Sequence, residues 1–166
     1  MINKYSRDML RAVLLILAAT LAQPALSAEE TAPTKSDMEE LRDKIYADKK
    51  LIVSENMDLT EEEASKFWPI YQAYQEDLHK INERMAKLIN EYALSYNKGA
   101  ILDKTARQLI DQAVDIEMDE AKLRKSYVPK LSKVIPGAKV ARYMQIENKI
   151  RAIVRYELAS AIPLAY

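Results

Sequence analysis

The side chains best suited to chemistry in this chain lie around its single histidine, His79. Glu76 stands three positions earlier, and Glu-x-x-His is half of the ligand set of a di-iron carboxylate site in a helix bundle. A complete site needs a second such pair, which a chain with one histidine does not hold. We therefore expect a solvent-exposed His79. The alternative is a metal site shared across a dimer axis, made by His79 with Glu76 or Glu83.

Other catalytic arrangements are missing from the sequence. The chain has no cysteine, which excludes disulfides and thiolate metal sites. It has neither a glycine-rich phosphate loop nor a nucleophile elbow of the G-x-S-x-G type. Carboxylate pairs such as Asp111 with Asp115 lie among lysines, as on a solvated helix face. We therefore expect no enzymatic activity and no cofactor.

A cluster of aromatic residues in LTEEEASKFWPIYQAY (59–74) is the strongest candidate for a binding site. It holds the only Phe and the only Trp of the chain, Phe67 and Trp68, followed by Tyr71 and Tyr74. Trp68 lies at the edge of an apolar stripe on which the other three fall, so burial is expected for those three. An amphipathic aromatic ring at the rim of a surface suits the binding of other chains. We predict a client- or partner-binding region here.

The helix that carries this cluster has a well-marked start. Thr60 is suited to the N-cap, and Glu63, three residues later, completes a capping box. From there apolar residues recur in alternating steps of three and four, the pattern of coiled-coil-like packing between neighbouring helices. The helix is expected to end near Tyr96, before Gly99. The apolar row consists of Ala64, Phe67, Tyr71, Tyr74, Leu78, Ile81, Met85, Leu88 and Tyr92.

Three further helices follow from the same periodicity. The first is expected over Asp37–Val53, with a break at Ser54–Asp58. The third is expected to start with Asp103 as its N-cap and to reach Val134, and the fourth runs from Pro136 to Ile162. Strand signals are absent, so the fold is predicted to be all-α. A flanking row widens the apolar stripe of the third helix, and it consists of Ile110, Val114, Ala121 and Val128.

Two of the predicted helices contain an internal proline, Pro69 in the second and Pro129 in the third. A proline inside a helix removes one backbone hydrogen bond and clashes with the carbonyl four residues earlier, which bends the helix. We therefore expect a thin, antiparallel, cradle-like arrangement with a concave face rather than a straight bundle.

The beginning of the chain has the pattern of a secretory signal peptide. A short basic segment precedes the apolar run Ala12–Ala22, which is too short to span a bilayer, and small residues follow. Cleavage is expected after Ala28, with Ser27 and Ala22 as alternatives; an uncleaved membrane anchor is the other interpretation. The predicted organisation is a signal peptide over 1–28, a disordered linker over 29–36, one helical domain over 37–162 and a tail over 163–166.

The charge balance limits the partners that the chain can have. It carries 25 basic and 25 acidic side chains, so it lacks the basic surface that nucleic acid requires. It also lacks a basic tail for an anionic membrane, and we expect no membrane insertion of the mature chain. The expected location is the periplasm, reached through the signal peptide.

Two pentapeptides give the chain a family resemblance. LTEEE (59–63) resembles the LTxxQ motif of the Spy/CpxP family of periplasmic stress proteins, with Glu in place of the final Gln. IPGAK (135–139) stands where the second motif belongs, with Ile for Leu, Pro for Thr and Lys for Gln. Glu and Gln both close a capping box, so the first substitution keeps the physical role. The resemblance covers residues 37–162.

The resemblance implies both a fold and a range of functions. Members of this family form bent four-helix chains that pair into cradle-shaped dimers. They act as ATP-independent chaperones, as inhibitors of an envelope-stress sensor kinase, or as zinc-responsive proteins. The resemblance therefore implies that this chain forms a homodimer and that its partners are partly unfolded proteins or a periplasmic sensor domain. In the cradle-type members the concave face is strongly basic, and the near-neutral charge of this chain departs from that pattern.

Overall fold

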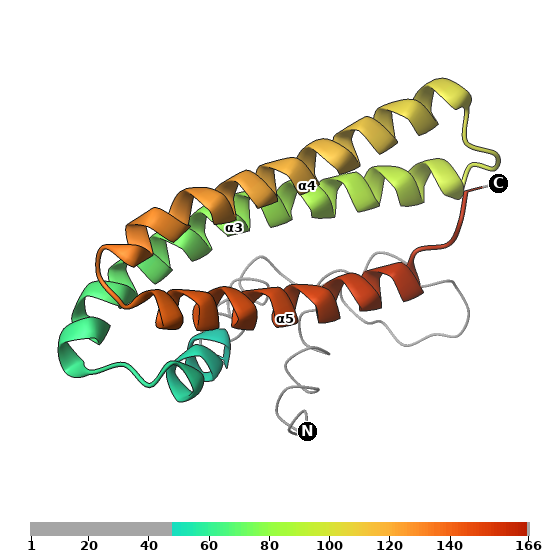
Figure 1. Ribbon diagram of the computed structural model, residues 1–166. Helices are drawn as coiled ribbons and strands as arrows, with labels where there is room; N and C mark the ends of the chain where they lie inside the picture. Colours follow the sequence, from blue (N-terminus) through green and yellow to red (C-terminus); the bar gives the residue numbers. More distant parts are fainter. Residues whose placement is uncertain (1–47, 166) are drawn as a thin grey trace, which may run out of the picture. The chain divides into compact units, whose positions relative to one another are not determined.

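The computed structural model describes residues 48–165, and within them the chain forms four helical segments and no strand (Figure 1). They are residues 48–57, α3 (Glu61–Tyr96), α4 (Asp103–Ser132) and α5 (Gly137–Ala161). The predicted all-α fold is therefore confirmed. The predicted signal peptide, the predicted linker and the beginning of the first helix lie outside the described residues.

The first helical segment extends further than the sequence indicated. We expected a break over Ser54–Asp58, but residues 54–57 are helical. The polar side chain of Ser54 donates to the carbonyl of Leu51 inside the same helix, at 2.8 Å, and the completely buried Met57 packs in the last turn. The chain leaves the helix at Asp58, whose φ of 49° lies in the left-handed region.

Helix α3 begins with the predicted capping box. The backbone N–H of Glu63 donates to Thr60 Oγ1 at 3.2 Å, and the backbone N–H of Thr60 donates to Glu63 Oε2 at 2.8 Å. These two bonds satisfy groups that the helix itself leaves without partners. At the far end, the chain turns beyond Tyr96 through Gly99, whose φ of 111° is one that side chains rarely allow.

The start of α4 differs from the prediction by one residue. Leu102 occupies the N-cap position, Asp103 is the first helical residue, and no side chain caps the helix. The carbonyl of Leu102 accepts the first intrahelical bond from the backbone N–H of Ala106, at 2.9 Å. Asp103 still places a negative charge at the positive end of the helix dipole, which explains its position without a capping role.

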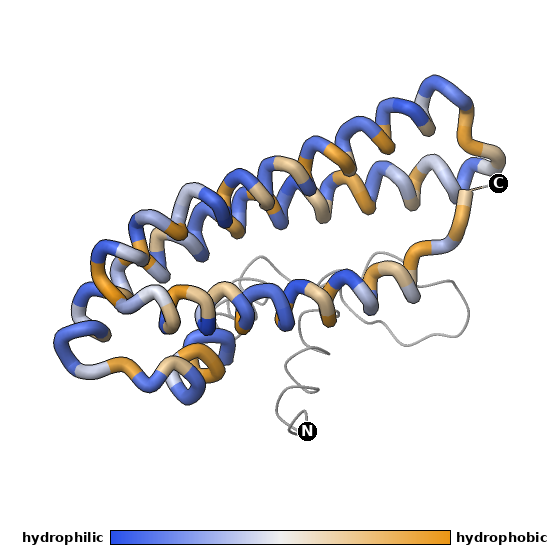
Figure 2. Tube along the Cα trace, viewed as in Figure 1, coloured by the Kyte–Doolittle hydropathy of each residue, from blue (hydrophilic) through white to orange (hydrophobic). Residues whose placement is uncertain are grey.

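Helices α3 and α4 lie side by side (Figure 1) and share an apolar core. Figure 2 shows apolar segments recurring among hydrophilic ones along both helices, as expected of amphipathic helices. The centre of this core is formed by Leu88 from α3 with Leu109 and Ile116 from α4. The partly buried residues packed against them are Ile81, Met85, Tyr92 and Ala113.

The flanking row of α4 lies outside this core. We expected Ile110, Val114, Ala121 and Val128 to widen the buried stripe, but all four are exposed. Ile110 is 62% exposed and Val114 is 51% exposed. The row is rotated beyond the sector of α4 that faces α3, because Ile110, Val114 and Val128 each follow a residue of the buried stripe by one position. Periodicity alone does not show where the contact sector ends.

Both long helices continue through their prolines, with Pro69 inside α3 and Pro129 inside α4. The contacts divide the described chain into two compact units. One contains residues 48–58 with 143–163, and the other contains residues 59–142 with 164–165. In the first unit, a buried ion pair joins Lys49 Nζ to Glu147 Oε2 at 2.8 Å. No helix of the described part is both long enough and apolar enough to cross a membrane.

Candidate functional site

Three of the four aromatic residues predicted for the binding region form one ring cluster on α3. The ring centroids of Phe67 and Trp68 lie 5.1 Å apart, and those of Trp68 and Tyr71 lie 5.3 Å apart, both with edge-to-face geometry. Phe67 and Tyr71 are 6.0 Å apart. Such contacts between aromatic rings add to the stability that burial alone provides. The indole of Trp68 is thus held in place by two neighbouring rings.

The members of this cluster differ in exposure. Phe67 is completely buried and Tyr71 is 5% exposed, whereas Trp68 is only half-buried. This difference follows from their positions, because Trp68 is one residue past a core position. An external ligand would therefore meet the cluster at Trp68, while Phe67 and Tyr71 support the indole from behind.

Tyr74, the fourth predicted residue, belongs to a different contact. It is 1% exposed, and its ring packs edge-to-face on Tyr127 of α4 with centroids 5.2 Å apart. The hydroxyl of Tyr127 donates to Asp77 Oδ2 at 2.7 Å. Lys130 Nζ lies 3.8 Å from the centroid of the Tyr127 ring, a cation–π contact. This group is a structural contact between α3 and α4.

The two titratable groups of this contact have shifted pKa values. Burial, and then the hydrogen bond to Asp77, raise the pKa of Tyr127 from 10.0 to about 12. The pKa of Asp77 is lowered, first by the hydrogen bond from Lys80 and then by that from Tyr127. Around neutral pH, Tyr127 is therefore a neutral donor to a charged carboxylate, an arrangement that holds the two helices together.

His79 and the two glutamates considered with it do not form a metal site within the described residues. His79 Nε2 lies 3.3 Å from Glu83 Oε1, and Glu76 accepts a hydrogen bond from Gln72 at 3.3 Å. The His79 side chain is 35% exposed. No group of three or more His, Cys, Asp or Glu side chains in the described part is placed to hold a metal ion.

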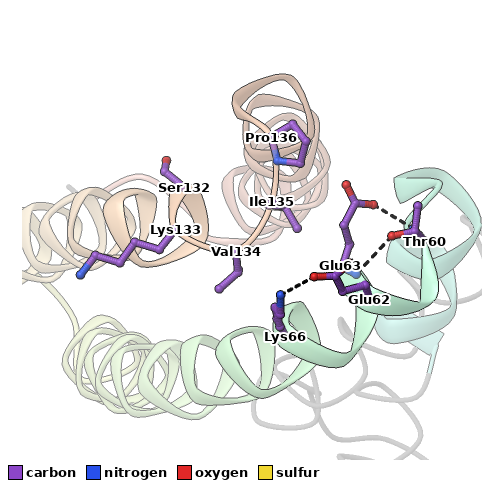
Figure 3. A pocket seen from close by; sticks show the side chains of 9 residues that line it. All are labelled: Thr60, Glu62, Glu63, Lys66, Ser132, Lys133, Val134, Ile135 and Pro136. Carbon is purple, nitrogen blue, oxygen red and sulfur yellow. Dashed lines mark hydrogen bonds and ion pairs between the residues drawn. The ribbon is translucent and has the colours of Figure 1, made fainter.

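The two motif-like pentapeptides meet at the start of α3. Lys139 Nζ donates to Glu63 Oε2 at 2.6 Å, so the fifth residue of LTEEE contacts the fifth residue of IPGAK. Beside this contact lies an open pocket of about 420 Å³ (Figure 3). The residues lining it are Thr60, Glu62, Glu63, Lys66, Ser132, Lys133, Val134, Ile135 and Pro136.

The pocket lining is mainly polar and carries both charges. Glu62 Oε1 and Lys66 Nζ form an ion pair at 2.7 Å (Figure 3). The carboxylate of Glu63 accepts hydrogen bonds from the backbone N–H of Thr60 and from Lys139 Nζ. The two hydroxyls of the lining serve the helices themselves: Thr60 Oγ1 accepts from the backbone N–H of Glu63, and Ser132 Oγ donates to the carbonyl of Val128. The arrangement is that of a stabilised helix start.

Several residues that organise this part of the structure were not identified from the sequence. They include Asp77 and Tyr127 with their hydrogen bond, and Lys139 as the partner of Glu63. The partners are separated by 50 and 76 positions along the chain. In the sequence, such a pair would show only as two polar or charged residues that each interrupt an apolar stripe. Many residues of this chain do so, and nothing local indicates which two are partners.

Comparison with known proteins adds no identification: no family model matches the chain, and neither a curated protein nor a solved structure matches it significantly. The resemblance of residues 59–63 and 135–139 to the paired LTxxQ motifs therefore stays a prediction. The contact between Glu63 and Lys139 is an observation about this chain alone.

Proposed function

We propose that this protein is an exported, non-enzymatic binding protein that holds partly unfolded proteins in the periplasm without ATP. The observation that carries the proposal is the half-buried Trp68, which is held by the buried rings of Phe67 and Tyr71. A fixed indole with one accessible side offers an apolar surface at little entropic cost on binding.

The same proposal includes the shape expected of the family that the two pentapeptides resemble. We propose that α3 and α4 form an antiparallel hairpin, bent at Pro69 and Pro129, and that two chains pair as a homodimer. The order of the contacts supports the antiparallel hairpin: residue 77 meets 127, and residue 84 meets 119. The prolines supply the bending element, since each lies within a continuous helix.

Two alternatives keep the same fold and change the ligand. The first is a metal-responsive sensor or buffer that uses His79, for which the 3.3 Å approach of Glu83 is the supporting contact. The second is a dedicated regulatory partner of a membrane sensor, which would bind one periplasmic domain and ignore generic clients.

One experiment separates these functions. The exported protein is mixed with a chemically denatured client at a near-stoichiometric ratio, without ATP, and light scattering reports aggregation with and without zinc. Suppression without zinc is the expected result. Suppression that requires zinc would replace the proposal by the metal-responsive alternative. No suppression under either condition would contradict client binding and leave the dedicated partner as the explanation.

A further inference from the structure

One face of α4 carries an apolar row that nothing in the described part of the chain covers. Its large members are Ile110, Val114, Met118 and Val128, which are 62%, 51%, 45% and 39% exposed. Ala121, also exposed, completes the row. The steps between members are those of one helix face, and the row spans about 27 Å at ~1.5 Å rise per residue. An exposed apolar row of this length, interrupted by Lys125, is typical of an interaction surface.

The charges of α4 are segregated around the centre of this row. Between residues 111 and 120 the chain has five acidic side chains and no basic one, and between 121 and 133 it has five basic side chains and no acidic one. Asp111 and Asp115 flank the first half of the row, Lys122 flanks the second half, and Lys125 lies within it. Asp111, Asp115 and Lys125 make no ion pair with other described residues. Asp119 and Glu120 pair with Lys122 and Arg124 of the same helix, so contacts among the described residues account for the charges near the centre of the row but not for these three.

From these two features we infer that the exposed face of α4 binds the same face of a second copy of the chain, with the two helices antiparallel. In an antiparallel pair related by a two-fold axis, each flank of one helix faces the same flank of the other. The acidic half of each α4 then lies along the basic half of its partner. A parallel pair would instead place like charges together.

The spacing of the row sets the register of this pair. The row is nearly symmetric about a point between residues 119 and 120, so Met118 lies beside Ala121 of the second copy. At each end, Ile110 lies beside Val128 of the second copy. Lys125 interrupts the apolar row, and in this register its aliphatic stem lies across Val114 of the second copy. Its ammonium group then reaches toward the two aspartates on either side of that valine.

This inference rests on the dimer included in the proposed function and names its surface, but it does not depend on client binding. The test measures self-association of the exported protein by sedimentation velocity over a range of concentrations. The first variant, Asp111→Lys with Asp115→Lys, makes both halves of the face basic. The second adds Lys122→Glu and Lys125→Glu, which restores opposite charges across the pair with the signs exchanged.

A matched control carries the same change in charge elsewhere. Glu55→Lys with Glu91→Lys alters two exposed residues that are not on α4. Circular dichroism of each variant checks that helix content is retained, which is expected because every changed residue is exposed.

We expect the first variant to weaken dimerisation roughly tenfold or more, because exposed charge pairs are individually weak but four of them change sign together. The second variant should return to within about threefold of the wild type. Equal weakening in the control, or no rescue by the second variant, would overturn the α4 surface while leaving a dimer possible. A wild-type monomer at all concentrations would overturn both the surface and the dimer. The aggregation assay measures client binding separately, so a failure of the proposed dimer surface and a failure of the proposed function can be told apart.

Discussion

Lys139 at the start of α5 donates a hydrogen bond to Glu63 in the first turn of α3, with 2.6 Å between Nζ and Oε2. These two residues are the last residues of the pentapeptides LTEEE (59–63) and IPGAK (135–139). The same carboxylate also closes the capping box with Thr60. One carboxylate therefore joins the start of α3 both to its own cap and to the start of α5.

The contact between Glu63 and Lys139 predicts coupled effects in a double-mutant cycle. Glu63→Gln retains a side chain that can close the capping box, and Lys139→Met retains the length of the stem. Each single change should lower the melting temperature by about 2–4 °C, and the double change should cost less than the sum. Thermal unfolding followed by circular dichroism measures all four proteins. Strictly additive effects would show that the two side chains do not interact in solution.

Removing the hydroxyl of Tyr127 should weaken the link between α3 and α4. Tyr127→Phe deletes one hydrogen bond to the Asp77 carboxylate and keeps the ring against Tyr74, so we expect a loss of about 1 kcal/mol in the free energy of unfolding. Urea unfolding measures it. Tyr156→Phe is the matched control, because Tyr156 is 71% exposed, and it should leave stability unchanged.

The same variant tests the titration of Tyr127. The pKa of Tyr127 is raised from 10.0 to about 12 in the folded chain, so its neutral hydroxyl contributes its full stabilisation below pH 10.0. That contribution is lost as the pH rises through about 12. In a spectrophotometric titration of the wild type, the ionisation of Tyr127 should appear as a late step near pH 12. Tyr127→Phe should remove that late step. A late step that persists in the variant would assign it to another tyrosine.

Acid should destabilise the protein through carboxylates that are paired in the folded chain. The pKa of Glu63 is lowered, mainly by the hydrogen bond from Lys139, and the pKa of Asp119 is lowered, mainly by that from Arg84. A lowered pKa adds stability above the ordinary values of 4.5 and 3.8, and this stability is lost as pH falls below them. The melting temperature should therefore be steady above about pH 5 and fall below it. A melting temperature that rises below pH 4 would contradict these pairings.

The buried pair of Lys49 and Glu147 should respond differently to single and double changes. Their side chains are 11% and 4% exposed, so Glu147→Ala removes a carboxylate that contacts a buried ammonium group and should cost about 3 kcal/mol. Lys49→Met combined with Glu147→Leu should recover most of that loss, because it removes both charges together. Chemical unfolding of the single and double variants tests this. A double variant that is no more stable than the single one would contradict the explanation.

The sequence predicted the elements of this fold better than their contacts. The capping box of Thr60 and Glu63 was predictable because it is local, involving residues three positions apart. The burial of Phe67, Tyr71 and Tyr74 followed from the periodicity of α3. The extra turn over residues 54–57 was missed because polar side chains there bond within the helix, a possibility that intrinsic preferences do not reveal.

The candidate site was predictable only in part, because its contacts also depend on residues far away in the sequence. Periodicity placed Trp68 at the edge of the stripe, but it did not separate Tyr74, which packs on Tyr127, from the Phe67–Trp68–Tyr71 cluster. It also assigned Ile110 and Val114 to the core, although both are exposed. Which sector of an amphipathic helix is covered depends on the neighbouring helix, and that information lies elsewhere in the chain.

The most direct test of the proposed function uses Trp68 as its own reporter, because it is the only tryptophan of the chain. The protein is titrated with an unfolded client that lacks tryptophan and carries a fluorescent label at one end. Anisotropy of the label measures binding, and indole emission with acrylamide quenching measures the environment of Trp68. The control is Tyr156→Ala, which removes an exposed aromatic ring on α5 and should leave binding unchanged.

If Trp68 contacts the client, binding should shift the indole emission to shorter wavelength and protect it from acrylamide. Trp68→Ala should then weaken binding about tenfold or more with unchanged helix content, as expected for an aromatic anchor. Client binding with unaltered indole emission and quenching, and with full affinity in Trp68→Ala, would contradict the proposed site.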